Sequence, residues 1–493
     1  MKKTICLLAV LALCFAVATM TASAEQPSLM DQAAVLIEAE DYDSAVPLLQ
    51  EAADQGEVGA QIIVGSCYAY GIGVEQNDAE AFRYYQMAAD QGDAMAQFSL
   101  GLCYDNGFGV EKNGDEALKY YQLAADQGDA NAIFNIGFMY YRGESVGKDY
   151  DMAVKYCTQA AEMEHPSAMF MMGMCYQDGT GVEKDPEAAA EWYRKALAAG
   201  YEPDEDDLNH LKACADGGIA VAQNELGKCY AQGIGVEADG EEAVKYFRLA
   251  ADQGFAKSQF NLANCYLNGL GVQQDAEKAA EYILLAVDQG LVQAQSQLGY
   301  MYENGFGVEA DLEKAVEYYQ AAADQGDTTA QNNLGNCYFY GRGVEQDIEK
   351  GIAYYQLAAE QGEPNALNSL GCCYCNGAGV ELDYEKAMEC FQLAAKQRQP
   401  DAIYNIGYNY FYGEGVEEDY DKALEYFREA AELGQPNAIF IIGVCYHEGK
   451  GVEKDPGQAA EWYQKALDAG YVPDEIDQEY LKEIFGEDYL ASK

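Results

Sequence analysis

Apolar residues recur along this chain in two blocks that return every 36 residues. In the stretch Leu334–Glu363, LGNCYFYGRGVEQDIEKGIAYYQLAAEQGE, one apolar block stands before a Gly-rich segment and a second block follows it. Within each block the apolar residues lie three and four positions apart, which is the spacing of one face of an α-helix. The pattern therefore predicts an all-α chain of helix pairs, each pair joined by a short Gly-rich loop.

The copies can be aligned on one residue, here called the anchor, which is the Gly of a Leu-Gly pair in most copies. The step between anchors is 36 residues except for one step of 54. A fixed period of this length is the signature of a solenoid. The eleven anchors are Gly65, Gly101, Gly137, Gly173, Gly227, Ala263, Gly299, Gly335, Gly371, Gly407 and Gly443.

The residues between two anchors predict where the helices begin and end. Twelve residues after every anchor stands Asp or Asn, for example Asp347, which suits the N-cap of a helix. The stretch that follows usually ends in Gly, as at Gly362, which suits a helix C-terminus with positive φ. The two glycines of the preceding GxGV segment allow a tight turn. We call the helix before this loop helix A and the helix after it helix B.

Helix A carries a nearly constant apolar face. Counted from the anchor, Ala stands at position −5 in ten copies and Ser258 in the remaining one. An aliphatic residue or Met stands at −1 and Tyr at +3 in all eleven copies. Small residues permit a close approach of helices, and a large ring fills the space beside them. We therefore interpret the Tyr row as core packing.

The complete unit, LGxCYxxGxGVxxDxxKAxxYYxxAAxxG, resembles the Sel-one-like repeat (SLR), a relative of the tetratricopeptide repeat. The resemblance extends from about Ala60 to Gly470. It implies an α/α right-handed superhelical solenoid in which helix A lines the concave face and helix B the convex face. It also implies an adaptor or scaffold for protein–protein contact rather than a catalyst.

The start of the chain is typical of a secretory signal peptide. Lys2 and Lys3 precede an apolar run that ends at Ala22-Ser23-Ala24, so cleavage is expected after residue 24. No later stretch is apolar enough to span a bilayer. We expect an exported bacterial protein, periplasmic or extracellular, without a membrane span.

The remaining chain is predicted to have five parts: an N-terminal helical cap (25–58), four repeats (59–200), an extra linker helix (201–219), seven repeats (220–471) and a C-terminal capping helix (472–493). The linker explains the step of 54 residues. WYRKALAAGYEPDEDDLNHLK, from Trp192, returns 270 residues later as WYQKALDAGYVPDEIDQEYLK, from Trp462. We interpret this as a segmental duplication that left a former C-terminal cap inside the chain.

The chain is strongly acidic, with 83 Asp and Glu against 30 Lys and Arg and a formal net charge of −53. Such a surface repels nucleic acid and anionic lipid, so neither is an expected partner. A basic protein partner is one hypothesis. The alternative is a solvated acidic exterior that binds nothing.

Eight cysteines stand at position +2 of helix A. Equivalent positions in stacked repeats should lie about 10 Å apart, whereas a disulfide needs Cα atoms closer than about 7 Å. We therefore expect these cysteines to be small buried hydrophobic residues. Cys390 shares a unit with Cys372, Cys373 and Cys375, which leaves one local disulfide open.

The sequence predicts no catalytic residue, cofactor or metal ligand. His165, His210 and His447 do not stand at metal-binding or catalytic spacings. Ser145-Val-Gly-Lys148 matches the SxxK pattern of β-lactamases, but the SDN and KTG motifs are absent. A weak β-lactam or peptidoglycan-related hydrolase using Ser145, and an acidic metal-binding protein, are kept as alternatives.

A peptide-binding groove is predicted on the variable side of helix A, where positions −3, −2, +1, +4 and +5 fall together. Asn amides can bind the backbone of an extended peptide, and aromatic rings can hold its side chains. The alternative is that Asn is merely tolerated on an exposed helix. The predicted binding residues are Asn332, Asn333, Asn336, Phe339, Tyr340, Asn368, Tyr404, Asn405, Phe411 and Tyr412.

Overall fold

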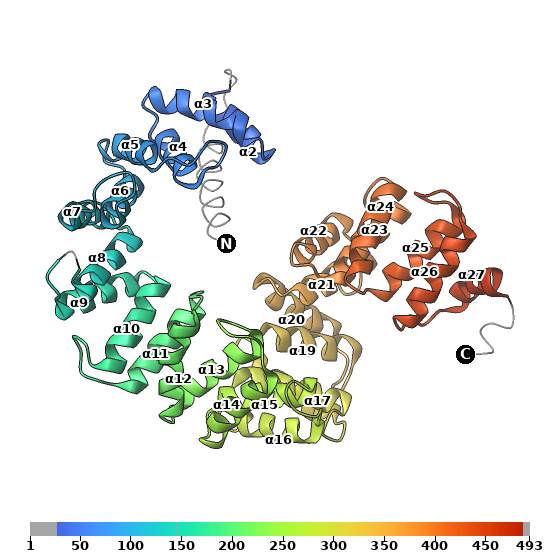
Figure 1. The fold of residues 1–493 in the computed structure, drawn as a ribbon. Coiled ribbons are helices and arrows are strands. Elements are labelled where there is room, and N and C mark those ends of the chain that lie inside the picture. Colours follow the sequence, from blue (N-terminus) through green and yellow to red (C-terminus); the bar gives the residue numbers. More distant parts are fainter. Residues whose placement is uncertain (1–26, 145, 487–493) are drawn as a thin grey trace. The chain divides into compact units, whose positions relative to one another are not determined.

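The computed structural model describes residues 27–144 and 146–486 (Figure 1). This part of the chain contains 26 α-helices and no β-strand, which confirms the all-α repeat solenoid. It divides into two compact units, Met1–Phe255 and Ala256–Lys493, and each is described by itself. The predicted signal peptide (1–24), Ser145 and the last seven residues lie outside the described residues.

The first unit holds five complete helix pairs. A short pair, α2 (Leu29–Glu38) and α3 (Tyr42–Asp54), precedes them, and α12 (Glu205–Asp216) stands between the fourth and fifth pairs, within the predicted linker. The pairs are α4 (Val58–Tyr70) with α5 (Asp78–Ala89), α6 (Ala94–Asn106) with α7 (Gly114–Ala125), α8 (Ala130–Arg142) with α9 (Tyr150–Glu162), α10 (Pro166–Asp178) with α11 (Pro186–Ala198), and α13 (Ala220–Gln232) with α14 (Gly240–Asp252).

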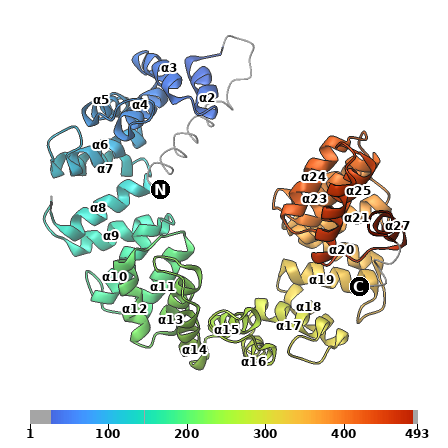
Figure 2. The ribbon, with the colours of Figure 1, turned by 45° about the vertical axis from the view of Figure 1, so that its right-hand side comes forward.

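The second unit holds six pairs, followed by α27 (Glu475–Phe485) (Figure 2). In both units helix A packs on its own helix B, and helix B packs on the next helix A. The six pairs are α15 (Ala256–Asn268) with α16 (Ala276–Val287), α17 (Val292–Asn304) with α18 (Leu312–Ala323), α19 (Thr328–Tyr340) with α20 (Ile348–Glu360), α21 (Pro364–Asn376) with α22 (Tyr384–Ala395), α23 (Pro400–Tyr412) with α24 (Tyr420–Glu432), and α25 (Pro436–Glu448) with α26 (Pro456–Asp468).

The loop glycines have the positive φ angles that their pattern predicts, as in the loop between α19 and α20. Gly341 ends α19 with φ 68°, and Gly343 has φ 74°. A Cβ atom on Gly343 would lie 2.3 Å from the carbonyl oxygen of Leu312, the first residue of the preceding helix B. The second loop glycine therefore permits close stacking of successive repeats, in addition to the turn itself.

The Asp twelve residues after the anchor fixes both ends of the loop. The side chain of Asp347 accepts a hydrogen bond of 2.9 Å from the backbone N–H of Lys350, which caps α20. The backbone N–H of the same Asp347 donates to the carbonyl oxygen of Tyr338 on α19 at 2.8 Å. One residue thus begins helix B and ties it to the last turn of helix A.

The anchor glycine makes room for a ring on helix B, twenty residues further along. A Cβ atom on Gly335 would lie 2.7 Å from the ring of Tyr355, which is fully buried. Tyr or Phe takes this place in nine repeats. The repeat with Ala263 as its anchor has the smaller Ile283 there instead, and both residues are fully buried. The remaining repeat keeps Gly137 as its anchor opposite the small Cys157. The sizes of the two positions are therefore matched in ten of the eleven repeats.

The Tyr row at position +3 packs between helix A and helix B, but ten of its eleven members are only half-buried. Tyr338 is typical, because its ring stacks on Tyr354 of helix B with centroids 5.9 Å apart and planes 10° apart. The ammonium group of Lys350 lies 3.8 Å from the Tyr338 ring centroid. The row packs against the core, as expected, and lies at its edge, where the rings are partly exposed to solvent.

A pair of glutamines joins the two ends of six repeats. Gln331, near the start of helix A, accepts a hydrogen bond of 3.0 Å from Nε2 of Gln361, beyond the end of helix B. Gln331 in turn donates to the carbonyl oxygen of Ala323 on the preceding helix B at 3.3 Å. Four repeats have an apolar residue at both positions, as with Ile403 and Leu433. The remaining repeat combines Leu367 with Gln397, whose Nε2 donates instead to the carbonyl oxygen of Gly362 at 2.7 Å. The two positions therefore differ together in ten of the eleven repeats.

The position +2 cysteines are buried, as predicted. Burial raises the pKa of the Cys103 and Cys337 thiols to about 12, so these thiols stay protonated at neutral pH. Cys372, Cys373, Cys375 and Cys390 carry free thiols, so the local disulfide left open by the sequence is not formed in this structure.

The helices α12 and α27 have the same surroundings, in agreement with a segmental duplication. Before α12, Tyr201 stacks on Phe170 with ring centroids 4.5 Å apart, and before α27, Tyr471 stacks on Phe440 at 4.4 Å. Both helices begin with a capping box.

In the described part of the chain, no helix is long and apolar enough to cross a membrane.

Candidate helix A binding face

The predicted groove lies on the side of the helices A that faces away from their own helices B. We define the helix A face by the half-buried and exposed residues at positions −2, +1 and +5 of four helices in the second unit. They are Gln297, Tyr300 and Asn304 on α17, Asn333, Asn336 and Tyr340 on α19, Ser369, Cys372 and Asn376 on α21, and Asn405, Tyr408 and Tyr412 on α23.

On α19 four of the five predicted residues are at least partly exposed to solvent. Asn333 and Asn336 are half-buried, and Tyr340 is 63% exposed. The Oδ1 atom of Asn336 accepts a hydrogen bond of 2.6 Å from the Tyr355 hydroxyl, which orients the amide. Phe339 is also half-buried, and its ring packs against Tyr355 with centroids 5.9 Å apart.

Asn332 is buried, with only 6% of its surface exposed. Its Nδ2 atom lies 3.4 Å from Oδ1 of Asn333, and its own Oδ1 has no hydrogen-bond partner in the described part of the chain. Position −3 is turned away from solvent here, so Asn332 can position Asn333 but cannot touch a partner.

A second group of predicted residues lies on α21 and α23. The Nδ2 atom of Asn405 donates to Oδ1 of Asn368 at 2.9 Å and lies 3.5 Å from the Cys372 sulfur, so the group spans two successive helices A. Beside it stands a column of rings, with Tyr404 to Tyr408 at 6.1 Å and Tyr408 to Tyr412 at 4.5 Å. Tyr412 is 51% exposed at the outer end of this column.

Phe411 is not part of the face. It is 2% exposed and packs against Phe427 and Tyr420 of helix B. Position +4 lies at the side of helix A that meets helix B, and a large ring there is drawn into the apolar core. Helical spacing places position +4 beside positions +1 and +5. It does not show how close helix B lies to position +4, so the burial of Phe411 was not predicted.

The face is hollowed where two helices A meet. A pocket of about 340 Å³ lies between α17 and α19, and Asn333 belongs to its wall. Tyr300, which the sequence analysis did not select, is 44% exposed and lies on the opposite wall. Tyr300 stands at position +1, which the sequence predicted to belong to the groove. It was not among the predicted residues because all of these lie between Asn332 and Tyr412.

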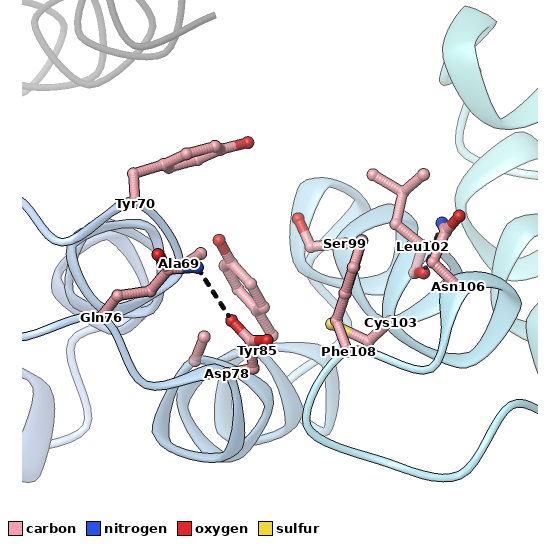
Figure 3. Close-up of a pocket in the computed structure, with 11 residues that line it drawn as sticks. Ala69, Tyr70, Gln76, Asp78, Tyr85, Ser99, Leu102, Cys103, Asn106 and Phe108 are labelled. Atoms are coloured by element: carbon pink, nitrogen blue, oxygen red, sulfur yellow. Dashed lines mark hydrogen bonds between the residues drawn. The ribbon is translucent and has the colours of Figure 1, made fainter.

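A similar pocket of about 380 Å³ lies in the first unit, between the α4–α5 pair and α6. Figure 3 shows the rings of Tyr70 and Phe108 on opposite sides of it, with Tyr85 between them. Its wall includes positions +4 and +5 of α4, positions −2 and +1 of α6, and the helix B residues Asp78, Ala81 and Tyr85. The pocket between α17 and α19 has no helix B residue in its wall, so the two pockets differ in position. The sequence analysis did not predict a site in this unit.

Burial keeps three titratable side chains of the helix A face, Cys372, Tyr408 and Tyr412, in their neutral forms at pH 7. Burial raises the pKa of the Cys372 thiol to about 12. Burial also raises the pKa of Tyr408 and Tyr412 above that of a free tyrosine. The face therefore offers amide, hydroxyl and aromatic groups without charge.

The histidines have structural roles. His165 caps α10 by accepting from the backbone N–H of Ala168 at 3.2 Å, and its ring stacks on Phe134 at 4.8 Å. Burial lowers the pKa of His165. In the described residues no group of three or more His, Cys, Asp or Glu side chains is arranged to hold a metal ion.

Fold and face together define an α-helical repeat scaffold of the kind suited to protein interaction. The Sel1 repeat is matched twelve times along the chain, and the chain belongs to the Sel1-repeat family. The first match, at 37–57, is short and covers α3, which the sequence analysis assigned to a cap. The matches are residues 37–57, 58–93, 94–129, 130–165, 166–201, 220–255, 256–291, 292–327, 328–363, 364–398, 400–435 and 436–471.

Solved structures of similar proteins include other members of this family. The chain is 31% identical to a protective antigen of uropathogenic Escherichia coli with an SLR fold, over 90% of this chain and 94% of that chain, with a TM-score of 0.47. It is also 31% identical to a Sel1 repeat protein from Oxalobacter formigenes, over 65% and 87% of the two chains, with a TM-score of 0.39. The yeast protein Tom70 is 15% identical, over 92% and 98%, with a TM-score of 0.32. No curated protein matches the chain.

Proposed function

We propose that this protein is a non-enzymatic, exported scaffold that binds a protein or peptide partner through the helix A face. The observation that carries the proposal is the row of exposed, uncharged polar and aromatic side chains along α17 to α23, centred on Tyr300, Tyr340 and Tyr412. Large aromatic side chains with a polar tip are enriched at protein interfaces. Export is supported by the basic start, apolar run and Ala-Ser-Ala of residues 1–24.

The test compares the wild-type protein with a variant in which three residues of the face, on α19 and α23, are truncated. This face variant combines Asn333→Ala, Tyr340→Ala and Tyr412→Ala and leaves the buried Asn332 and Phe411 unchanged. The matched control combines Leu357→Ala and Leu393→Ala, because these side chains on α20 and α22 are 44% and 49% exposed and lie on helices B.

Each protein is expressed with its own N-terminus in a bacterium, recovered from envelope and medium, and used for affinity capture from the same fractions. We expect the recovered protein to have the mass of a chain that begins at Glu25. We also expect one partner to be captured by the wild-type protein and the control but not by the face variant. Equal capture by all three proteins would contradict a role for the face, and a recovered protein that keeps residues 1–24 would contradict export.

A further inference from the structure

The acidic residues of this chain avoid the helices A. Helices A contribute eleven helices of 13 residues each, yet they hold only six of the 83 acidic residues of the chain. These six are Asp105, Asp178, Glu225, Glu303, Asp401 and Glu448, and the basic residues on the same helices are Arg142, Lys228 and Lys257. The strong negative charge therefore belongs to the helices B, the loops and the ends of the chain.

Two helices of the helix A face, α19 and α21, contain no charged residue at all. The two flanking helices carry one carboxylate each. Asp401 on α23 accepts from Nε2 of Gln399 at 3.0 Å and from Nε2 of Gln435 at 3.2 Å. Glu303 on α17 is 12% exposed and pairs with Arg342 at 2.8 Å. It also accepts a hydrogen bond of 2.7 Å from Tyr319. The carboxylate is thus already neutralised by groups of its own chain.

The face still has hydrogen-bonding capacity. Asn336 and Asn368 use their Oδ1 atoms to accept from Tyr355 and Asn405, which leaves their Nδ2 groups without a partner in the described part of the chain. The hydroxyls of Tyr340 and Tyr412 also have no hydrogen-bond partner among the described residues. Amide N–H groups fit carbonyl oxygens, and a Tyr hydroxyl can donate or accept, so these groups match the backbone of an extended polypeptide.

A charged side chain would lose affinity on this face. It would leave water for a surface that offers no opposite charge, and an unpaired charge removed from water is costly. The acidic helices B attract cations only through solvent, where the Debye length is about 8 Å at physiological ionic strength. A basic segment therefore finds most of its counter-charges outside the helix A face. The carboxylate in the wall of the α17–α19 pocket, that of Asp327, already caps α19 by accepting from the backbone N–H of Ala330 at 2.7 Å.

We infer that the helix A face of α17 to α23 binds an uncharged, extended segment of a partner protein, and that the acidic surface of the chain does not contribute to this affinity. The inference rests on the proposed function and adds the chemistry of the partner. Binding at the face is expected to be insensitive to salt, whereas any binding of basic proteins occurs elsewhere and is sensitive to salt.

The probe is a library of random twelve-residue peptides displayed on phage, selected on the full-length protein in 150 mM NaCl. Enriched peptides are synthesised, and their Kd values are measured by fluorescence anisotropy at 50 and 500 mM NaCl. The measurements use wild type, the face variant and the helix B control. An octalysine peptide is measured in parallel as a probe for the acidic exterior.

We expect enriched peptides without net charge, Kd values that change less than twofold between the two salt concentrations, and a loss of tenfold or more in the face variant alone. Octalysine should lose affinity with salt and should not distinguish the three proteins. Lys- or Arg-rich peptides that depend on the face would overturn the inference but keep the proposed function. Peptides that bind the face variant as tightly as the wild-type protein would overturn both the inference and the proposed function. The same holds if no peptide is enriched and neutral oligosaccharides bind the face instead.

Discussion

At the scale of single residues, the packing of most repeats depends on a size match between the anchor glycine of helix A and an aromatic ring of helix B. The anchor glycine lies under the aromatic residue twenty positions later, as Gly335 lies under Tyr355. A glycine inside a helix costs about 1 kcal/mol relative to alanine, so its presence in ten of eleven helices A needs a reason. The reason is packing, because alanine occurs as anchor only where Ile283 replaces the ring.

This match predicts a non-additive pair of substitutions. Gly335→Ala alone should destabilise the α19–α20 pair by about 1–3 kcal/mol, because the new Cβ overpacks the Tyr355 ring. Tyr355→Ile alone should cost about 2–4 kcal/mol through the cavity that it leaves. The double variant reproduces the Ala263–Ile283 combination and should cost at least about 1 kcal/mol less than the sum. Native-state hydrogen exchange of α19 and α20 measures the loss of stability in the two single variants and in the double variant. If the loss in the double variant equals the sum of the single losses, the size match is contradicted.

At the scale of the element, a repeat is closed by contacts between its own two helices. The Gln331–Gln361 bond joins the start of helix A to the end of helix B, and Asp347 joins the last turn of helix A to the first turn of helix B. Gln331 is 2% exposed, so its amide depends on these partners. Four of the five repeats without this pair place apolar residues at both ends instead.

The glutamine pair should tolerate joint replacement better than single replacement. Gln361→Leu alone leaves Oε1 of the buried Gln331 without its donor and should cost about 1–3 kcal/mol. Gln331→Ile together with Gln361→Leu reproduces the Ile403–Leu433 combination and should cost less than about 1 kcal/mol. Urea denaturation followed by circular dichroism compares the two variants. A double variant less stable than the single one would show that the pairing is not the reason for the joint variation.

Helices, loops and caps could be predicted from the sequence because eleven copies repeat the same local signals, such as Asp347 and Gly362. The candidate site could be predicted only in part. Asn333, Asn336, Tyr340 and Tyr412 reach the surface, but Asn332 and Phe411 do not, because helical spacing gives an angle around helix A and not the distance to the neighbouring helices. The size match between anchor and ring was visible in the sequence, at Ala263 and Ile283, and was missed.

At the scale of the whole molecule, charge is the dominant feature. A formal net charge of −53 on 493 residues places many carboxylates near one another on helices B and loops. The ion pairs on these surfaces are exposed, as between Lys314 and Asp311 at 3.3 Å, and such pairs contribute little. Repulsion among the unpaired carboxylates opposes the compact state.

Salt should therefore stabilise the protein. Raising NaCl from 10 to 300 mM shortens the Debye length and weakens the repulsion, so Tm should rise by at least ~2 °C. Differential scanning calorimetry at pH 7 measures the change, with choline chloride as a control that screens charge without sodium. A Tm that stays constant or falls in both salts would show that repulsion does not limit stability.

Both matched pairs of positions, anchor with ring and glutamine with glutamine, lie inside a single 36-residue repeat. A crossover during gene duplication that falls in the turn after helix B moves each pair as a whole, and every repeat keeps its internal fit. A crossover in the GxGV loop would combine a helix A with a foreign helix B and could set an alanine against a tyrosine ring. The pairing thus favours growth and shortening of the array by whole repeats, so that its length can change in evolution without a new core being needed.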